Sequence, residues 1–173
     1  DVLSSRGLGD VYKRQVLDVD GKIFAQTGAI ARFCGKLSGL YPKDNDLAAA
    51  RIDQVIEVAQ DINYLFTLSS RDKEKQKLKL ARKILATKHL PKYFNFLENL
   101  IKENDNSLFF VGENISIADL AIWRLLGWFE SGIIDGVPTN ILEPYENLKK
   151  MRNEIYKHPK VNDWMIKTYG KVI

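Results

Sequence analysis

The amino-acid sequence predicts a mostly α-helical protein in which a short β-β-α unit precedes an all-helical region. Two observations support this fold class. From residue 46 nearly to the C-terminus, apolar residues recur at three- and four-residue steps, which is the period of an amphipathic helix. Before that region, two short β-rich runs flank the pair Asp20-Gly21, which is typical of a β-hairpin.

Residues 1–15 have no hydrophobic period and no turn residues that connect them to the β-rich run starting at Val16. They resemble the translation of a sequencing adapter, and we expect them to be a foreign segment that replaces the natural N-terminal part. The alternative is a disordered native N-terminus. In both cases this segment does not contribute to the predicted fold.

The hairpin comprises residues 16–19 and 22–26, and Thr27 is the expected N-cap of a helix over residues 28–36. A two-stranded hairpin with one helix is not stable by itself. We therefore interpret residues 16–38 as the end of a larger domain, whose other strands are missing or supplied elsewhere.

Residues 39–45 are polar, contain glycine and proline, and are expected to link this unit to the all-helical region 46–173. Pro91 should bend or break one of the helices of that region. The expected helices run from Asp46 to about Thr67, from near Arg71 through Pro91 to about Asn104, from Ile117 to Phe129, from about Tyr145 to before His158, and around Trp164.

The start of the helix at residue 117 is specified most strongly. Ser116 lies three residues before Asp119, which is the spacing of a capping box, and Ile115 can meet Leu120 as a hydrophobic staple. The helix after this cap is apolar almost all round, so we expect it in the middle of the core.

This stretch, with its lead-in Phe109-Phe110-Val111-Gly112, resembles the buried central helix of the C-terminal domain of glutathione transferases. The sequence around Asp20-Gly21-Lys22, together with the stretch from Ala25 to Phe33, resembles the closing half of the thioredoxin-like domain of the same family, and is most similar to the sigma class. The resemblance implies the C-terminal part of a glutathione-binding thioredoxin-like domain over 16–38, followed by the all-helical glutathione transferase C-terminal domain over 46–173.

The resemblance also implies a glutathione site. Gln26 and Thr27 would hold the γ-glutamyl end of glutathione, because a helix start with a hydroxyl suits a carboxylate. Asp61 would reach the amino group of glutathione across the interface of a homodimer. The alternative is that Asp61, with Glu57 and Asp53 one and two turns earlier, forms only a solvated edge of a helix.

In this family a Tyr or Ser hydroxyl on the first strand activates the glutathione sulfur. That strand would be absent from this chain, and Gln15 stands where a cis-proline is expected. The resemblance thus implies an intact protein that conjugates glutathione, as co-substrate, to small hydrophobic electrophiles in detoxification, whereas the truncated chain would be inactive and contain no catalytic residue. The alternatives are a non-catalytic crystallin-like or scaffold relative, or a module of a translation factor.

Composition argues against other classes. The net charge is +4, but basic and acidic residues are interleaved, so we expect no nucleic-acid partner. No apolar run is long enough for a membrane, and a single cysteine favours a reducing compartment, by default the cytoplasm. His89 and His158 have no ligands at metal spacing, so we assign no metal site, and Cys34 is expected to be a small core residue.

Overall fold

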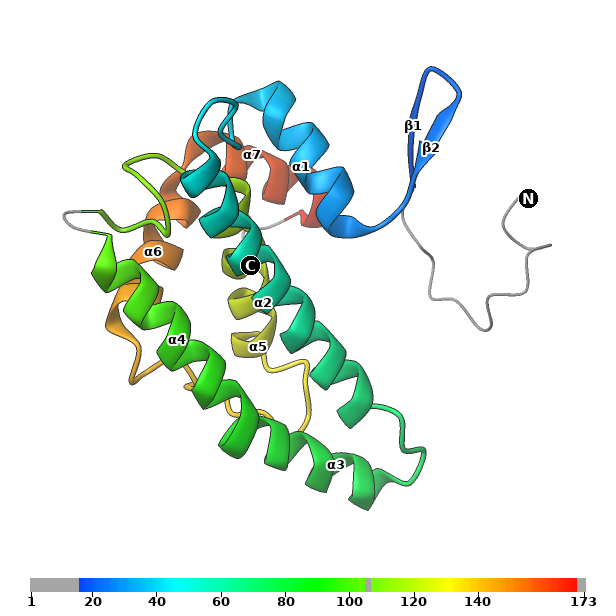
Figure 1. Cartoon of the computed structure of the whole chain (residues 1–173). Helices are drawn as coiled ribbons and strands as arrows, with labels where there is room; N and C mark the ends of the chain where they lie inside the picture. Colours follow the sequence, from blue (N-terminus) through cyan, green and yellow to red (C-terminus); the bar gives the residue numbers. More distant parts are fainter. Residues whose placement is uncertain (1–15, 105–106, 171–173) are drawn as a thin grey trace.

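In the computed structural model of the chain, residues 16–104 and 107–170 are described, and the expected foreign segment 1–15 lies outside them. The protein is mostly helical, as the sequence predicts (Figure 1). In chain order the elements are β1 (Leu17–Val19), β2 (Lys22–Phe24), α1 (Thr27–Ser38), α2 (Asp46–Ser69), α3 (Lys75–Ile84), the π-helical turn η1 (Leu85–His89), α4 (Leu90–Glu103), α5 (Ile117–Glu130), α6 (Glu146–Lys157) and α7 (Pro159–Tyr169).

The predicted hairpin is confirmed. β1 and β2 pair antiparallel, and both turn residues have left-handed backbones, with φ of 51° at Asp20 and 77° at Gly21. Such a turn follows the twist of the two strands. The hairpin stands away from the helices (Figure 1), but the ring of Phe24 stacks on Phe33 of α1 with 5.7 Å between the ring centroids.

Helix α1 packs through its glycines. Gly28 and Gly35 are its buried residues, and a Cβ atom on Gly35 would lie only 2.8 Å from Cγ2 of Ile117. The expectation that Cys34 belongs to the core is wrong, because the glycine face turns inward and the cysteine is exposed.

Helix α2 is the longest helix and lies against α5. Asn45 is its N-cap and accepts a hydrogen bond of 3.0 Å from the amide of Ala48, and the helix begins at Asp46, as the sequence predicts. The buried face of α2 consists of Ile52, Val55, Ile56, Ala59 and Ile62.

The predicted break at Pro91 takes the form of a π-helical turn, η1, which joins α3 to α4 just before the proline. A π turn changes the phase of the helix without exposing its backbone, so the chain stays helical from α3 into α4. Pro91 follows this turn directly, next to Leu90, whose amide bonds to the carbonyl of Leu85.

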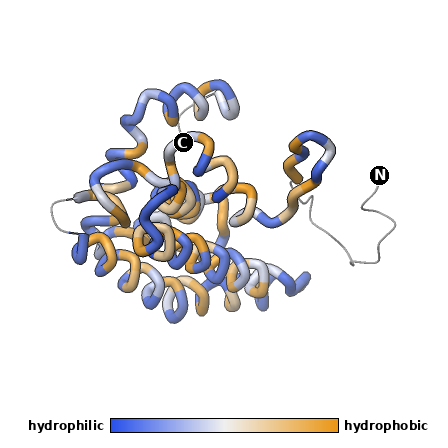
Figure 2. Tube along the Cα trace, turned by 45° about the horizontal axis from the view of Figure 1, so that its top comes forward, coloured by the Kyte–Doolittle hydropathy of each residue, from blue (hydrophilic) through white to orange (hydrophobic). Residues whose placement is uncertain are grey.

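Helix α5 is the centre of the core, as the sequence predicts. Ile122, Leu126 and Phe129 are fully buried, and α5 contacts α1, α2 and α6. The amide of Ile117, its first residue, donates a 3.0 Å hydrogen bond to the carbonyl of Leu40, which ties the segment between α1 and α2 to the start of α5. Figure 2 shows apolar residues concentrated where the helices face one another.

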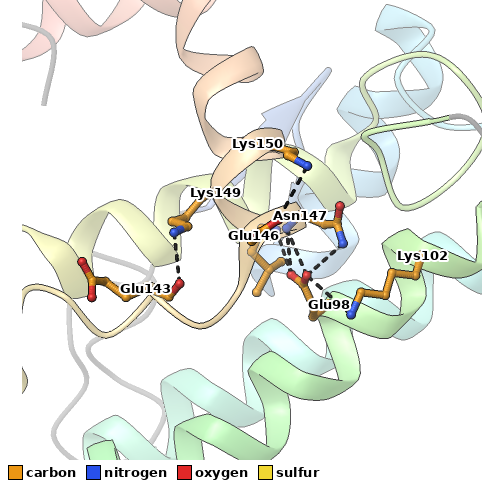
Figure 3. A network of polar contacts seen from close by, with 8 residues as sticks. Glu98, Lys102, Glu143, Glu146, Asn147, Lys149 and Lys150 are labelled. Carbon is orange, nitrogen blue, oxygen red and sulfur yellow. Dashed lines mark hydrogen bonds and ion pairs between the residues drawn. The ribbon is translucent and has the colours of Figure 1, made fainter.

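A buried carboxylate joins α4 to α6 (Figure 3). Glu98, 6% exposed, accepts hydrogen bonds from the backbone amides of Asn147 and Leu148 and from the side-chain amide of Asn147. These amides belong to the first turn of α6, whose own N-cap residue, Tyr145, makes no side-chain cap. Glu98 therefore caps α6 from another helix.

Candidate functional site

The start of α1 is exposed and strained. Gln26 is its N-cap residue, with φ of 75° and ψ of 118°, a conformation that residues with a side chain rarely adopt. Thr27 is the first helical residue, so the expectation that Thr27 is the N-cap is wrong by one position. Within the described residues no side chain caps this turn, so its first amides have no side-chain partner, and the side chains of Gln26 and Thr27 are exposed.

An ion-pair cluster fixes this turn to α2. Arg32 donates from Nε to Oδ1 of Asp53 at 2.6 Å and from Nη2 to Oε1 of Glu57 at 2.9 Å. The hydroxyl of Tyr41 donates to the same Oδ1 of Asp53 at 3.1 Å. The pKa of Arg32 is raised, mainly by its hydrogen bond to Asp53.

Gly28 brings the cluster close to the backbone. A Cβ atom on Gly28 would lie 3.2 Å from Nη1 of Arg32 and 3.4 Å from Cγ2 of Ile56. The guanidinium therefore folds back under the first turn of α1. The amides of a helix start and the Thr27 hydroxyl together form an arrangement that can bind a carboxylate.

Asp61 lies elsewhere on α2. It is exposed and comes eight residues, or about two turns, after Asp53. No hydrogen bond or ion pair between described residues joins Asp61 to Gln26 or Thr27, so the chain by itself does not bring the three predicted residues together. The pKa of Tyr93 in α4 is raised by burial and, to a smaller extent, by the carboxylate of Asp61.

The interpretation of Asp53, Glu57 and Asp61 as one solvated edge is incomplete, because the first two residues also bind Arg32. The sequence of α2 alone does not reveal these ion pairs, because their basic partner lies on the preceding helix, α1. Arg32 lies 21 residues before Asp53, so neither the spacing nor the periodicity of α2 indicates the pairing.

The predicted capping box at Ser116 and Asp119 is confirmed. Oδ2 of Asp119 accepts from the amide of Ser116 at 2.8 Å and from its hydroxyl at 2.6 Å, while Oδ1 accepts from the amide of Phe110 at 2.9 Å. Asp119 is fully buried. Burial raises the pKa of this carboxyl, and the hydrogen bonds from Ser116 and Phe110 offset part of that shift. The box holds α5 and the loop before it in place.

A cavity of about 600 Å³ opens between α5 and α7. The two predicted staple residues, Ile115 and Leu120, line it together with the indole rings of Trp123 and Trp164. On α1 it is bounded by Ser38, at the opposite end of the helix from Thr27. The cavity is therefore separate from the exposed start of α1.

The described residues offer no further candidate site of the metal or membrane type. Among them, no three histidine, cysteine, aspartate or glutamate side chains are grouped as metal ligands would be. In the same part of the chain, none of the helices combines the length and hydrophobicity required to cross a bilayer.

The sequence and the structure of this chain are similar to those of known proteins. The chain is 32% identical over 119 residues to a glutathione S-transferase of Plasmodium yoelii yoelii, an alignment that covers 67% of this chain and 52% of that protein. It is 25% identical over 163 residues to S-crystallin 4 of Enteroctopus dofleini, covering 88% of this chain and 73% of the crystallin. The solved structure of prostaglandin synthase D of Nilaparvata lugens matches with a TM-score of 0.76 and 27% identity, over 88% of this chain and 73% of that one.

The chain thus spans about half to three quarters of the length of these relatives. Residues 60–168, which cover α3 to α6, part of α2 and most of α7, match the family model described as the glutathione S-transferase C-terminal domain. Since that match takes in more than half of the chain, this protein belongs to the glutathione S-transferase family.

Proposed function

We propose that this protein acts as a sigma-like glutathione transferase, conjugating the glutathione thiolate to small hydrophobic electrophiles. The observation that carries the proposal is the strained, exposed Gln26 at the start of α1, directly before Thr27. Strained backbones persist mainly where function requires them. The ligand we propose for this helix start is glutathione, by resemblance to the family to which the chain belongs.

The γ-glutamyl end of glutathione carries a carboxylate and an ammonium group. The carboxylate accepts hydrogen bonds from the free amides of the first turn of α1 and from the hydroxyl of Thr27, while Gln26 contacts the same group from the N-cap position.

The ammonium group of glutathione binds the carboxylate of Asp61 from a second subunit. Asp61 is exposed on α2 and has no bond to the start of α1 among the described residues of its own chain. A homodimer that apposes the two α2 helices would give each site a carboxylate from the partner. This arrangement makes the dimer part of the binding site rather than only a stabilising assembly.

The reaction itself requires a thiolate. A hydroxyl that donates to the glutathione sulfur lowers the pKa of the thiol and so supplies the nucleophile at neutral pH. By resemblance this hydroxyl belongs to a strand that precedes β1, so this chain by itself should bind glutathione weakly and turn over little. We place the protein in the cytoplasm, with detoxification of electrophiles as its role.

A second candidate function is supported by the similarity to S-crystallin 4 of Enteroctopus dofleini, which extends over 163 residues. In that case the fold would be retained without catalysis. The two candidates share the helical domain and differ in whether the complete site activates a thiol.

Turnover with chlorodinitrobenzene tests whether this chain can complete a catalytic site. The N-terminal part of the Nilaparvata lugens synthase is joined to Val16, and the hybrid is compared with the chain alone. We expect glutathione-dependent turnover in the hybrid and little in the chain itself. A folded hybrid that binds glutathione without turnover would favour the crystallin-like alternative, and equal turnover in both proteins would place the activating hydroxyl within this chain.

A further inference from the structure

We propose that Asp53, acting through Arg32, is a positioning residue for glutathione: the ion pair between α1 and α2 holds the first turn of α1 in the place where Thr27 and its neighbouring amides can bind the γ-glutamyl carboxylate. This inference rests on the proposed function. It assigns a binding role to a cluster that otherwise would serve only the stability of the fold.

The contacts converge on one turn of α1. Arg32 binds both Asp53, at 2.6 Å, and Glu57, at 2.9 Å, and these acids lie one turn apart on α2. Two carboxylates on one guanidinium fix its direction, since its N–H groups form a rigid fork. The hydroxyl of Tyr41 donates to Oδ1 of Asp53 at 3.1 Å and so also holds this carboxylate.

The guanidinium then supports the helix start. Arg32 lies one turn after Gly28, and its Nη1 occupies the space next to Gly28 that a Cβ atom would approach to 3.2 Å. The first turn of α1 therefore rests on Arg32 and on Ile56 of α2. The hairpin before it adds a single aromatic stack, between Phe24 and Phe33. Helix α2 therefore supports the first turn of α1, while α5 holds the other end of the helix through Gly35.

Partial exposure of the ion pair limits its effect on glutathione affinity. The side chains of Arg32 and Asp53 are 30% and 36% exposed, which weakens their attraction through solvent screening. Loss of the pair should loosen the first turn without unfolding the protein. The expected consequence is roughly a threefold loss of glutathione affinity, in the range of partly exposed ion pairs.

The test is an NMR titration of the chain as it exists with reduced glutathione, following the backbone amide of Thr27. Asp53→Asn removes the charge and should weaken binding about threefold. Asp53→Glu keeps the charge and should restore the affinity. Glu103→Gln is the matched control, because it removes another ion pair of α2, that of Arg51 with Glu103, away from α1.

The outcomes are distinct. Unchanged affinity in Asp53→Asn, together with weaker binding in Thr27→Ala, would overturn the inference and leave the proposed function standing. A wild-type Thr27 amide that does not respond to glutathione would overturn the proposed site as well. If Asp53→Asn also shifts the amides of α5, Glu57→Gln, which removes only the outer and more exposed pair, replaces it, and unchanged affinity in that variant would equally contradict the inference.

Discussion

Glu98 of α4 binds both the backbone amide and the side-chain amide of Asn147, which lies 49 residues later at the start of α6. The distances are 3.0 and 2.8 Å to the same carboxylate oxygen. A buried acid thus satisfies amides that α6 cannot satisfy within itself, and it joins two helices that the hydrophobic pattern alone would only place near each other.

We expect Glu98→Ala to be strongly destabilising, because it leaves two backbone amides of α6 without an acceptor. The loss should be about 2 to 3 kcal/mol in the free energy of unfolding, measured by urea denaturation. Glu103→Ala on the same helix is the control, since Glu103 is exposed and should change stability by less than about 0.5 kcal/mol. Equal effects in the two variants would show that the cap adds no stability.

The capping box predicts a second stability effect. Ser116→Ala and Asp119→Ala each remove part of the network at the start of α5, and each should lower the free energy of unfolding by at least about 1 kcal/mol. Asp119→Ala should cost more, because the amides of both Ser116 and Phe110 lose their acceptor. Denaturant melts in which neither substitution changes stability would contradict this role.

The pH dependence of stability depends on Asp119. Burial raises its pKa above the unfolded value, so the folded protein binds more protons than the unfolded chain between the two pKa values. The contribution of this carboxyl to stability is greatest below about pH 4, falls as the pH rises through the folded pKa, and is constant above it.

The comparison of wild type with Asp119→Asn isolates this effect from other acids. We expect the stability advantage of wild type over the variant to decrease as the pH rises through this window, measured by urea melts at several pH values. An advantage that grows with pH would mean that the hydrogen bonds from Ser116 and Phe110 outweigh the cost of burial.

Gly35 gives a prediction about packing. An alanine there would place Cβ 2.8 Å from Cγ2 of Ile117 and 3.0 Å from Cβ of Tyr41. Although alanine favours helices over glycine by up to about 1 kcal/mol, the overlap should make Gly35→Ala destabilising by about 1 to 3 kcal/mol. Lys36→Ala, at the next and exposed position, is the control, and thermal melts are the measurement. A stabilised Gly35→Ala would show that α1 can move away from α5.

The features that the sequence predicts correctly depend on neighbouring residues. The Asp20-Gly21 turn and the capping box of Ser116 with Asp119 each involve residues no more than three apart, so the spacing in the sequence is enough to predict them. The buried central position of α5 is predicted by its apolar composition, which requires no knowledge of its partners.

The features that the sequence does not predict join distant residues. Arg32 with Asp53 and Glu98 with Asn147 are 21 and 49 residues apart, and each partner taken alone is an ordinary polar residue of an amphipathic helix. The inward face of α1 was also missed, since hydrophobic periodicity counts Cys34 as a core residue and gives no weight to Gly28 and Gly35. Close backbone approach at a glycine is a property of the packed structure.

The affinity of the hybrid for glutathione tests the central claim, that the start of α1 binds the γ-glutamyl group, most directly. Calorimetric titration compares wild type with Thr27→Ala, with Thr27→Ser, which keeps the hydroxyl, and with Thr67→Ala as a control on the distant end of α2. We predict that Thr27→Ala weakens binding by about 1 to 3 kcal/mol, the cost of leaving a charged ligand group without its hydrogen bond, whereas the other two variants bind as wild type does. Unchanged affinity in Thr27→Ala would contradict the account and leave Thr27 as merely the first residue of a helix.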